Sequence, residues 1–300
     1  MPTRAPTPTP ERPPLSTRTD DDAAESLLLP TRRLPGWTDG LHSGAYLASP
    51  QMNGALFSMC LVKMSSGCVA ADPLPGVERF FLVLEGSIDC AYSSPTDEVK
   101  SFRIAASGPV GPHPEGRSGD YVFIPADNDP EGDDDGTCVE CDEDGTVVLM
   151  FEQRYRPPGG HCVERPRKLI YGFVDDQPPL DPGAPEVFGL RKLLPLEEAY
   201  DFNIHVMDFE PGQFLHCNEM HYNQHGMLML EGQGVYRLGE KHWYHVRAGD
   251  AIYMAPYVPQ WYAALEPGRT RYVLYKDTYR DPLLSGSAGR GTRDKLGDRA

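Results

Sequence analysis

The sequence lacks the features that would assign it to several common classes of protein. With 28 Lys and Arg against 44 Asp and Glu, its formal net charge is -16, so it has no excess of the basic side chains that bind nucleic acids or anionic membranes. No run of about 18 apolar residues predicts a transmembrane helix. The N-terminus, rich in Pro and Thr, lacks the apolar core of a secretory signal. We therefore expect no nucleic-acid partner and no membrane partner.

The cysteines do not form a recognisable framework. There are seven of them, an odd number scattered along a long chain, which predicts no disulfide scaffold. Cys138 and Cys141 form a lone CxxC pair. A zinc ribbon needs a second such pair, so we interpret this one as incidental. It lies in an acidic stretch, residues 127–144, which holds ten carboxylates and no Lys or Arg; we expect a solvated, self-repelling loop rather than a calcium site.

Helical periodicity is also scarce, and the short segment Pro195–Tyr200 is the best helix candidate. Gly and Pro number 30 each and separate many runs of strand length. Short, evenly spaced strands predict an all-β protein built of barrels or jelly rolls. The predicted strands are 55–62, 79–84, 121–124, 146–151, 205–209, 227–230, 235–238, 243–246, 251–254 and 271–275.

An internal repeat indicates two copies of one barrel. A Leu-Glu-Gly tripeptide ends a predicted strand at Gly86 and again at Gly232, and each copy continues to a Gly-Asp pair, at Gly119 and at Gly249. The spacing between the glycines is 33 residues in the first copy and 17 in the second, which predicts an insertion near residues 93–116. The predicted organisation is a disordered leader (1–33), an N-terminal barrel (34–156), a linker (157–185), a C-terminal barrel (186–283) and a disordered tail (284–300).

The chemistry is concentrated in the second copy. Six of the nine histidines lie between His205 and His245. Residues two apart on a strand point to the same face, so Glu219 and His221 should both point into the barrel, and His225 can join them after a local bend. This is a pattern typical of metal ligands gathered inside a barrel.

Two segments resemble the conserved motifs of the cupin superfamily. Gly212 to Gly232 resembles the first motif, with Glu219, His221 and His225 at its three ligand positions, although cupins usually have His, His and Glu there. The segment from Gly249 resembles the second motif, with Gln260 where cupins have His and with Ala255 and Tyr257 replacing the usual Pro and Gly. The resemblance implies a bicupin, with two tandem jelly-roll domains.

The first copy serves as an internal control. The same offsets place Pro73, Pro75, Arg79 and Pro130 at its four ligand positions, and none of these side chains binds a cation. We therefore expect a metal only in the second barrel. Two imidazole nitrogens with two oxygens suit Mn²⁺, with Fe²⁺, Zn²⁺, Ni²⁺ or Co²⁺ as alternatives; Cys217 matches no ligand position.

The amino-acid sequence of the second half is very similar to those of the plant-type (S)-ureidoglycine aminohydrolase family. The similarity is dense from about Glu186 to Leu283 and weaker but colinear from about Leu34. It implies hydrolysis of (S)-ureidoglycine to (S)-ureidoglycolate and ammonia in purine and allantoin breakdown, with one Mn²⁺ per chain. Placed on this sequence, the family's metal ligands are Glu219, His221, His225 and Gln260, and its substrate-binding residues are Glu219, Tyr236, Tyr272 and Lys276.

The resemblance further implies that Glu219 and Lys276 act in catalysis. It implies a homo-oligomer, and a location in the endoplasmic reticulum, although no signal peptide is visible and the cytoplasm is otherwise expected. Two alternatives stay open at this point: a cupin that binds a small ligand without chemistry, and another metal-dependent cupin enzyme such as an oxidase or isomerase. Gln260 disfavours a redox enzyme, because a neutral amide does little to stabilise a higher oxidation state.

Overall fold

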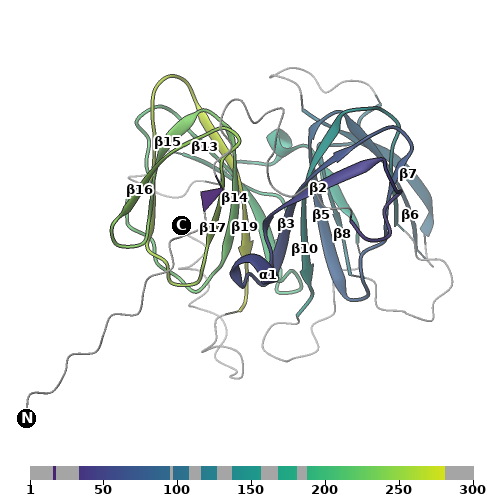
Figure 1. Cartoon of the computed structure of the whole chain (residues 1–300), viewed down its shortest axis with the longest axis horizontal. Helices are drawn as coiled ribbons and strands as arrows, with labels where there is room; N and C mark the ends of the chain where they lie inside the picture. The colour runs from purple at the N-terminus through teal and green to yellow at the C-terminus, as the bar shows by residue number, and fades with distance from the viewer. Residues whose placement is uncertain are drawn as a thin grey trace, which may run out of the picture.

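The computed structural model describes residues 16–17, 34–94, 97–107, 116–126, 137–156, 168–180 and 188–280. Within them the chain forms two β-barrels that lie side by side (Figure 1), which confirms the all-β bicupin prediction. The described helical elements are the four-residue α1 (Pro50–Asn53) and the 3-10 turn η3 (Val174–Asp176). The helix predicted over Pro195–Tyr200 is wrong, because this segment forms turns. No helix in the described part of the chain is long and apolar enough to cross a membrane.

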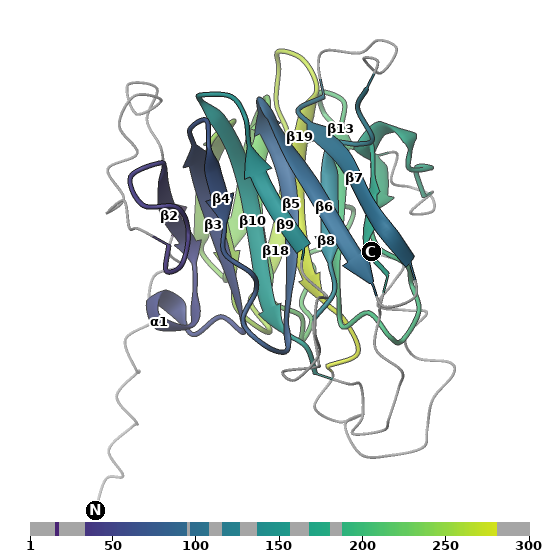
Figure 2. The same cartoon turned by 90° about the vertical axis from the view of Figure 1, so that its right-hand side faces the viewer.

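The first barrel consists of a six-stranded sheet, in the order β11-β8-β5-β10-β3-β2, and a four-stranded sheet, β4-β9-β6-β7. Figure 2 shows the four-stranded sheet in front of the larger one. The strands are β2 (His42–Ala48), β3 (Phe57–Met64), β4 (Cys68–Ala70), β5 (Val77–Glu85), β6 (Ser87–Ser94), β7 (Asp97–Ala105), β8 (Tyr121–Ile124), β9 (Thr137–Cys141), β10 (Thr146–Arg154) and β11 (Ile170–Gly172).

The second barrel has the same design, with a six-stranded sheet in the order β1-β17-β14-β19-β13-β12 and a three-stranded sheet, β16-β15-β18. All ten predicted strands are present in the structure. The strands of this barrel are β1 (Ser16–Thr17), β12 (Gly189–Lys192), β13 (Phe202–Phe209), β14 (His225–Glu231), β15 (Gln233–Leu238), β16 (His242–Arg247), β17 (Ala251–Met254), β18 (Gln260–Ala264) and β19 (Thr270–Asp277).

The strand register confirms that the two barrels are copies of one unit. Arg79 of β5 stands between Ile124 of β8 and Glu152 of β10. His225 of β14 stands in the same way between Met254 of β17 and Lys276 of β19. The first-barrel counterparts of His225 and Lys276 are therefore Arg79 and Glu152.

The residue of the first barrel that corresponds to Gln260 is different from the one predicted. Gln260 of β18 pairs with Leu238, six residues after Gly232. Six residues after Gly86, Tyr92 of β6 pairs with Thr137 of β9. Thr137 is thus the counterpart of Gln260, and the prediction of Pro130, which lies outside the described residues, is wrong. A fixed sequence offset failed because the β8–β9 connection is longer than the β17–β18 connection.

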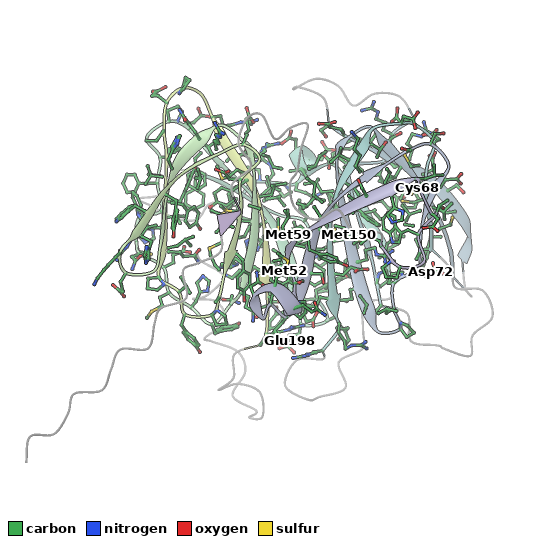
Figure 3. All side chains as sticks on the ribbon, viewed as in Figure 1. Met52, Met59, Cys68, Asp72, Met150 and Glu198 are labelled. Carbon is green, nitrogen blue, oxygen red and sulfur yellow. The ribbon has the colours of Figure 1, made fainter. Side chains whose placement is uncertain are left out.

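The two barrels are joined by their six-stranded sheets, which face each other across a buried apolar layer. Alternate residues of these strands point into this layer or into their own barrel. In Figure 3, Met59 of β3 lies on the side of the second barrel and Met150 of β10 on the side of the first. The layer is rich in aromatic rings, and Phe57 stacks on Tyr275 with ring centroids 3.9 Å apart.

Four elements lie where the sequence predicted unstructured or connecting segments. β1 falls within the predicted leader and extends the sheet of the second barrel by pairing with β17. β11 and η3 fall within the predicted linker, and β11 pairs with β8 of the first barrel. β9 falls within the predicted acidic loop and pairs with β4 and β6. The remainder of the leader and the tail after residue 280 lie outside the described residues.

We expect Gly232→Ala to destabilise the protein far more than Gly212→Ala. Both glycines have positive φ, +73° and +83°, where a Cβ costs about 1–2 kcal/mol. At Gly232 the added Cβ would also lie 2.4 Å from the Arg269 carbonyl oxygen, whereas at Gly212 it meets nothing within 4 Å. The loss in free energy of unfolding, measured with denaturant, should be about 1–2 kcal/mol for Gly212→Ala and above about 3 kcal/mol for Gly232→Ala. Equal losses would contradict the close approach at Gly232.

Candidate metal centre and active site

The four predicted ligands come together between the two sheets of the second barrel. His225 is the first residue of β14 in the large sheet, and Gln260 is the first residue of β18 in the small one. Glu219 exchanges both backbone hydrogen bonds with Gln260, at 2.8 and 2.9 Å. His221 lies in the segment between Glu219 and His225. The four side chains are therefore brought together because the loop at Glu219 pairs with the first residue of β18.

The imidazole of His221 is the centre of this group. Its Nε2 atom lies 3.2 Å from Nε2 of His225, 3.1 Å from Nε2 of Gln260 and 3.8 Å from Oε2 of Glu219. Neighbouring ligands of one octahedral metal are about 3.0 Å apart when each bond is about 2.1 Å. The distances from His221 to His225 and to Gln260 match that value, whereas the carboxylate of Glu219 lies farther from His221.

The donor set fits a divalent cation, though it is not preassembled. Among the described residues, no three His, Cys, Asp or Glu side chains form a ready-made metal cluster. The Nε2 atoms of His221 and His225 lie 3.2 Å apart. At this distance the lone pair of one nitrogen must point either at the N–H of the other ring or at a cation bound between them. A metal ion between His221, His225 and Glu219 would satisfy both nitrogens and the carboxylate together.

The amide of Gln260 is held by Tyr236. The Tyr236 hydroxyl donates to Oε1 of Gln260 at 2.9 Å, so that Nε2 faces His221. Burial, followed by the charge of Glu219, raises the pKa of Tyr236 well above its usual 10, which keeps the hydroxyl protonated. The oxygen and nitrogen of an amide are similar in size, and rotation about the last C–C bond exchanges them. The rotated amide would present Oε1, the atom that binds cations, to the ligand group.

His225 is prepared to bind through one nitrogen. Its Nδ1 atom lies 3.1 Å from the carbonyl oxygen of Tyr275, an arrangement that fixes the tautomer and leaves a lone pair on Nε2. Burial, followed by the charges of His221 and Lys276, lowers the pKa of His225 well below 6.5. The neutral imidazole is the form that metals bind.

Lys276 and His205 extend the site along the large sheet. Lys276 is 5% exposed and lies beside His225 in the register of β19 and β14. His205, 3% exposed on β13, has the inward parity of its neighbours Met207 and Phe209. Burial, then the charge of Lys276, lowers the pKa of His205 well below 6.5. His205 bounds the histidine-rich segment but belongs to neither cupin motif, so the motifs gave no signal that it is a site residue.

Two other candidates lie away from the ligand group. Tyr272 shares the inward face of β19 with Lys276, but four residues along the strand, which is about 13 Å. It is 2% exposed, and its ring packs against Phe209 and Tyr262. Tyr262 in turn contacts Tyr236, so Tyr272 belongs to the aromatic floor below the ligands. Cys217 is exposed, in agreement with its exclusion from the ligand set.

The first barrel replaces the metal group with an ion pair. The Arg79 guanidinium donates to Glu152 from both Nε and Nη2, at 2.8 and 2.6 Å, and the Arg79 side chain is 5% exposed. The same guanidinium lies over the rings of Trp37 and Phe81, at 6.0 and 5.6 Å. An Arg cation fills the place where the second barrel has its imidazole.

Comparison with known proteins supports this architecture. No family model matches the chain. A probable (S)-ureidoglycine aminohydrolase from Oryza sativa is 47% identical over 252 residues, 84% of this chain and 71% of the relative. The (S)-ureidoglycine aminohydrolase of Arabidopsis thaliana is 45% identical over 83% and 73% of the two chains. The crystal structure of Escherichia coli YlbA superposes with a TM-score of 0.61, at 25% identity over 84% of this chain and 88% of the other.

The two barrels, together with the plant relatives, define a bicupin hydrolase. Its sequence identity to the plant enzymes, over more than two thirds of each chain, settles the family. The chain belongs to the (S)-ureidoglycine aminohydrolase family.

Replacing His205 should weaken the acid sensitivity of the fold. His205 titrates near its usual 6.5 when unfolded and at much lower pH when folded, so its contribution to stability is complete above about pH 6.5 and declines as the pH falls below that value. The free energy of unfolding of metal-free protein should therefore fall less between pH 7.5 and 5.5 in His205→Gln, by roughly 1–2 kcal/mol.

His245→Gln, at an exposed position of β16, is the matched control: it removes one imidazole without changing a buried group, and it should not reproduce the effect of His205→Gln. If His205→Gln retains the parent's pH dependence, His205 is not buried as a neutral imidazole.

Proposed function

We propose that this protein hydrolyses (S)-ureidoglycine to (S)-ureidoglycolate and ammonia with the help of Mn²⁺. Glu219, His221, His225 and the Oε1 atom of Gln260 would hold the ion. The observation that carries the proposal is the convergence of Glu219, His225 and Gln260 on Nε2 of His221. The names of the plant relatives support the reaction and its substrate.

The electrostatics of the site suit an anionic substrate. A divalent ion with one carboxylate ligand, Glu219, keeps a net charge of +1, and Lys276 adds a point charge nearby. When bound, the ion would supply positive charge that orients and polarises the carboxylate and amine of the substrate. Lys276 would pair with the carboxylate in a place where little water competes, since it is 5% exposed.

Tyr236 would fix the ureido arm, and Tyr272 would support it from the aromatic floor. With the Gln260 amide rotated towards the metal, its N–H group donates to the Tyr236 oxygen, and the Tyr236 O–H becomes available to the substrate. Tyr272 would complete the floor of the pocket from the same face of β19 as Lys276. Such fixed donors align the reacting carbon with the groups that act on it.

The reaction exchanges one C–N bond for one C–O bond at the carbon that carries both nitrogens. Electron donation from the ureido nitrogen allows the amine to leave as ammonia, once the amine has gained a proton, and gives an imine-like intermediate. Water then adds to that carbon and loses a proton. Glu219 would first give a proton to the leaving amine as general acid and would then take up the proton that the added water loses as general base, so that it ends each turnover as it began.

The proposal extends to the setting of the reaction. We propose, on the strength of the family resemblance, that the step belongs to the breakdown of purine-derived ureides and that the protein is a homo-oligomer of the endoplasmic reticulum. The acidic net charge agrees with a small-molecule substrate and with the absence of a nucleic-acid partner.

Chelation should abolish ammonia release, and Mn²⁺ should restore it. The test follows ammonia and product chirality from freshly generated (S)-ureidoglycine with EDTA-treated protein, before and after addition of Mn²⁺. The chirality separates enzymatic turnover from spontaneous decay. We expect only the (S)-product; absence of acceleration despite one bound metal per chain would reject the reaction.

Glu219→Ala should lower kcat by about 100-fold or more, because it removes both a ligand and the proposed proton carrier. Glu219→Gln separates the two roles, since the amide keeps a ligand oxygen but cannot accept the proton. Both variants are compared at matched metal content. Near-normal turnover of Glu219→Gln would show that Glu219 is a ligand and no base.

A further inference from the structure

The segment between the two histidine ligands is held by side chains that do not face the metal group. Asn223 and Gln224 are 5% and 6% exposed. The Asn223 amide donates to the backbone carbonyl of Asp277, and the Gln224 N–H donates to the Asp277 carboxylate. This ties the ligand segment to the end of β19, next to Lys276.

The first barrel reaches into the same segment. The N–H group of Leu56 donates to Oε1 of Gln224 at 2.9 Å, a bond between residues 168 positions apart. Leu56 follows α1, whose helical turn is capped by the Ser49 hydroxyl and ends in the left-handed Gly54. Figure 1 shows α1 at the boundary between the barrels. A capped turn of the first barrel therefore presents one backbone donor to a side chain lying between two ligands.

Apolar packing fixes the next residues of the ligand strand. A Cβ on Gly226 would lie 2.6 Å from the ring of Phe57 and 3.1 Å from Sδ of Met59, so the first barrel rests directly on the backbone beside His225. Phe57 also stacks on Tyr275, whose carbonyl oxygen lies by Nδ1 of His225. Both the backbone and the second nitrogen of His225 are thus fixed from the first barrel's side.

We propose that the metal-free first barrel positions the metal ligands of the second, with Gln224 and Phe57 as its positioning residues. The inference rests on the proposed function, because it concerns the same ligand set. Gln224 transmits the position of Leu56 to His221 and His225, and Phe57 sets the depth at which β14 lies. Without the contact of Leu56 with Gln224, or of Phe57 with Gly226, all four ligand residues are still present, but their side chains no longer have the geometry that the ion needs.

The test compares Gln224→Met with Phe123→Leu. Methionine keeps the length of glutamine but removes the acceptor for the Leu56 N–H. Phe123→Leu weakens the same interface at another place, since Phe123 packs on Tyr200 and Phe202. Mn²⁺ dissociation constants are measured by titration with paramagnetic resonance, and Co²⁺-loaded proteins are compared by their visible spectra. Neither readout needs substrate.

Gln224→Met should bind Mn²⁺ about 10-fold or more weakly, the usual effect of removing a group that orients a ligand, and should change the Co²⁺ spectrum. Phe123→Leu should keep the parent's affinity and spectrum while losing stability. Affinity within twofold of the parent and an unchanged spectrum in Gln224→Met would overturn the proposal, as would an equal loss in both variants.

If Gln224→Met does not fold, Phe57→Leu is judged by the same two readouts. The parent protein separates the two hypotheses. A parent that binds Mn²⁺ but does not accelerate hydrolysis rejects the reaction while the positioning role can still be confirmed. A parent that binds neither Mn²⁺ nor Co²⁺ rejects both.

Discussion

Two strands, β14 and β19, serve two layers at once, and the rest of the structure depends on this. One face of each strand carries His225 and Lys276 into the second barrel, and the other face carries Gly226 and Tyr275 onto the first. Because side chains alternate strictly along a strand, neither face can shift without the other. The buried apolar layer between the barrels therefore fixes the position of His225 and Lys276 within the second barrel.

The two barrels share one strand arrangement but carry different buried polar side chains at equivalent positions. At equivalent positions the second barrel has an imidazole and a lysine, and the first has an arginine and a glutamate. Arg79 and Glu152 balance each other's charge, since Nε and Nη2 of Arg79 both donate to Oε1 of Glu152. His225 and Lys276 form no such ion pair, because burial keeps the imidazole of His225 neutral.

Burial gives this site its chemical character. His205 and His225 are held neutral by the low polarity around them and by the nearby charge of Lys276. Burial, followed by the charge of Glu219, raises the pKa of Tyr236 and holds its hydroxyl protonated. A set of neutral nitrogen donors, one lysine and one glutamate suits a divalent ion and an anionic substrate, because each charge then has a partner.

The sequence by itself predicted ten of the strands, the repeat and the convergence of Glu219, His221, His225 and Gln260, because alternation and motif spacing are local properties. It missed further strands, β1, β9 and β11 among them. It also placed Pro130 where the structure has Thr137, because a connection's length cannot be read from its composition. The contact of Leu56 with Gln224 also required the fold. Such contacts depend on which faces of the two barrels meet, and that is decided by packing between residues far apart in the chain.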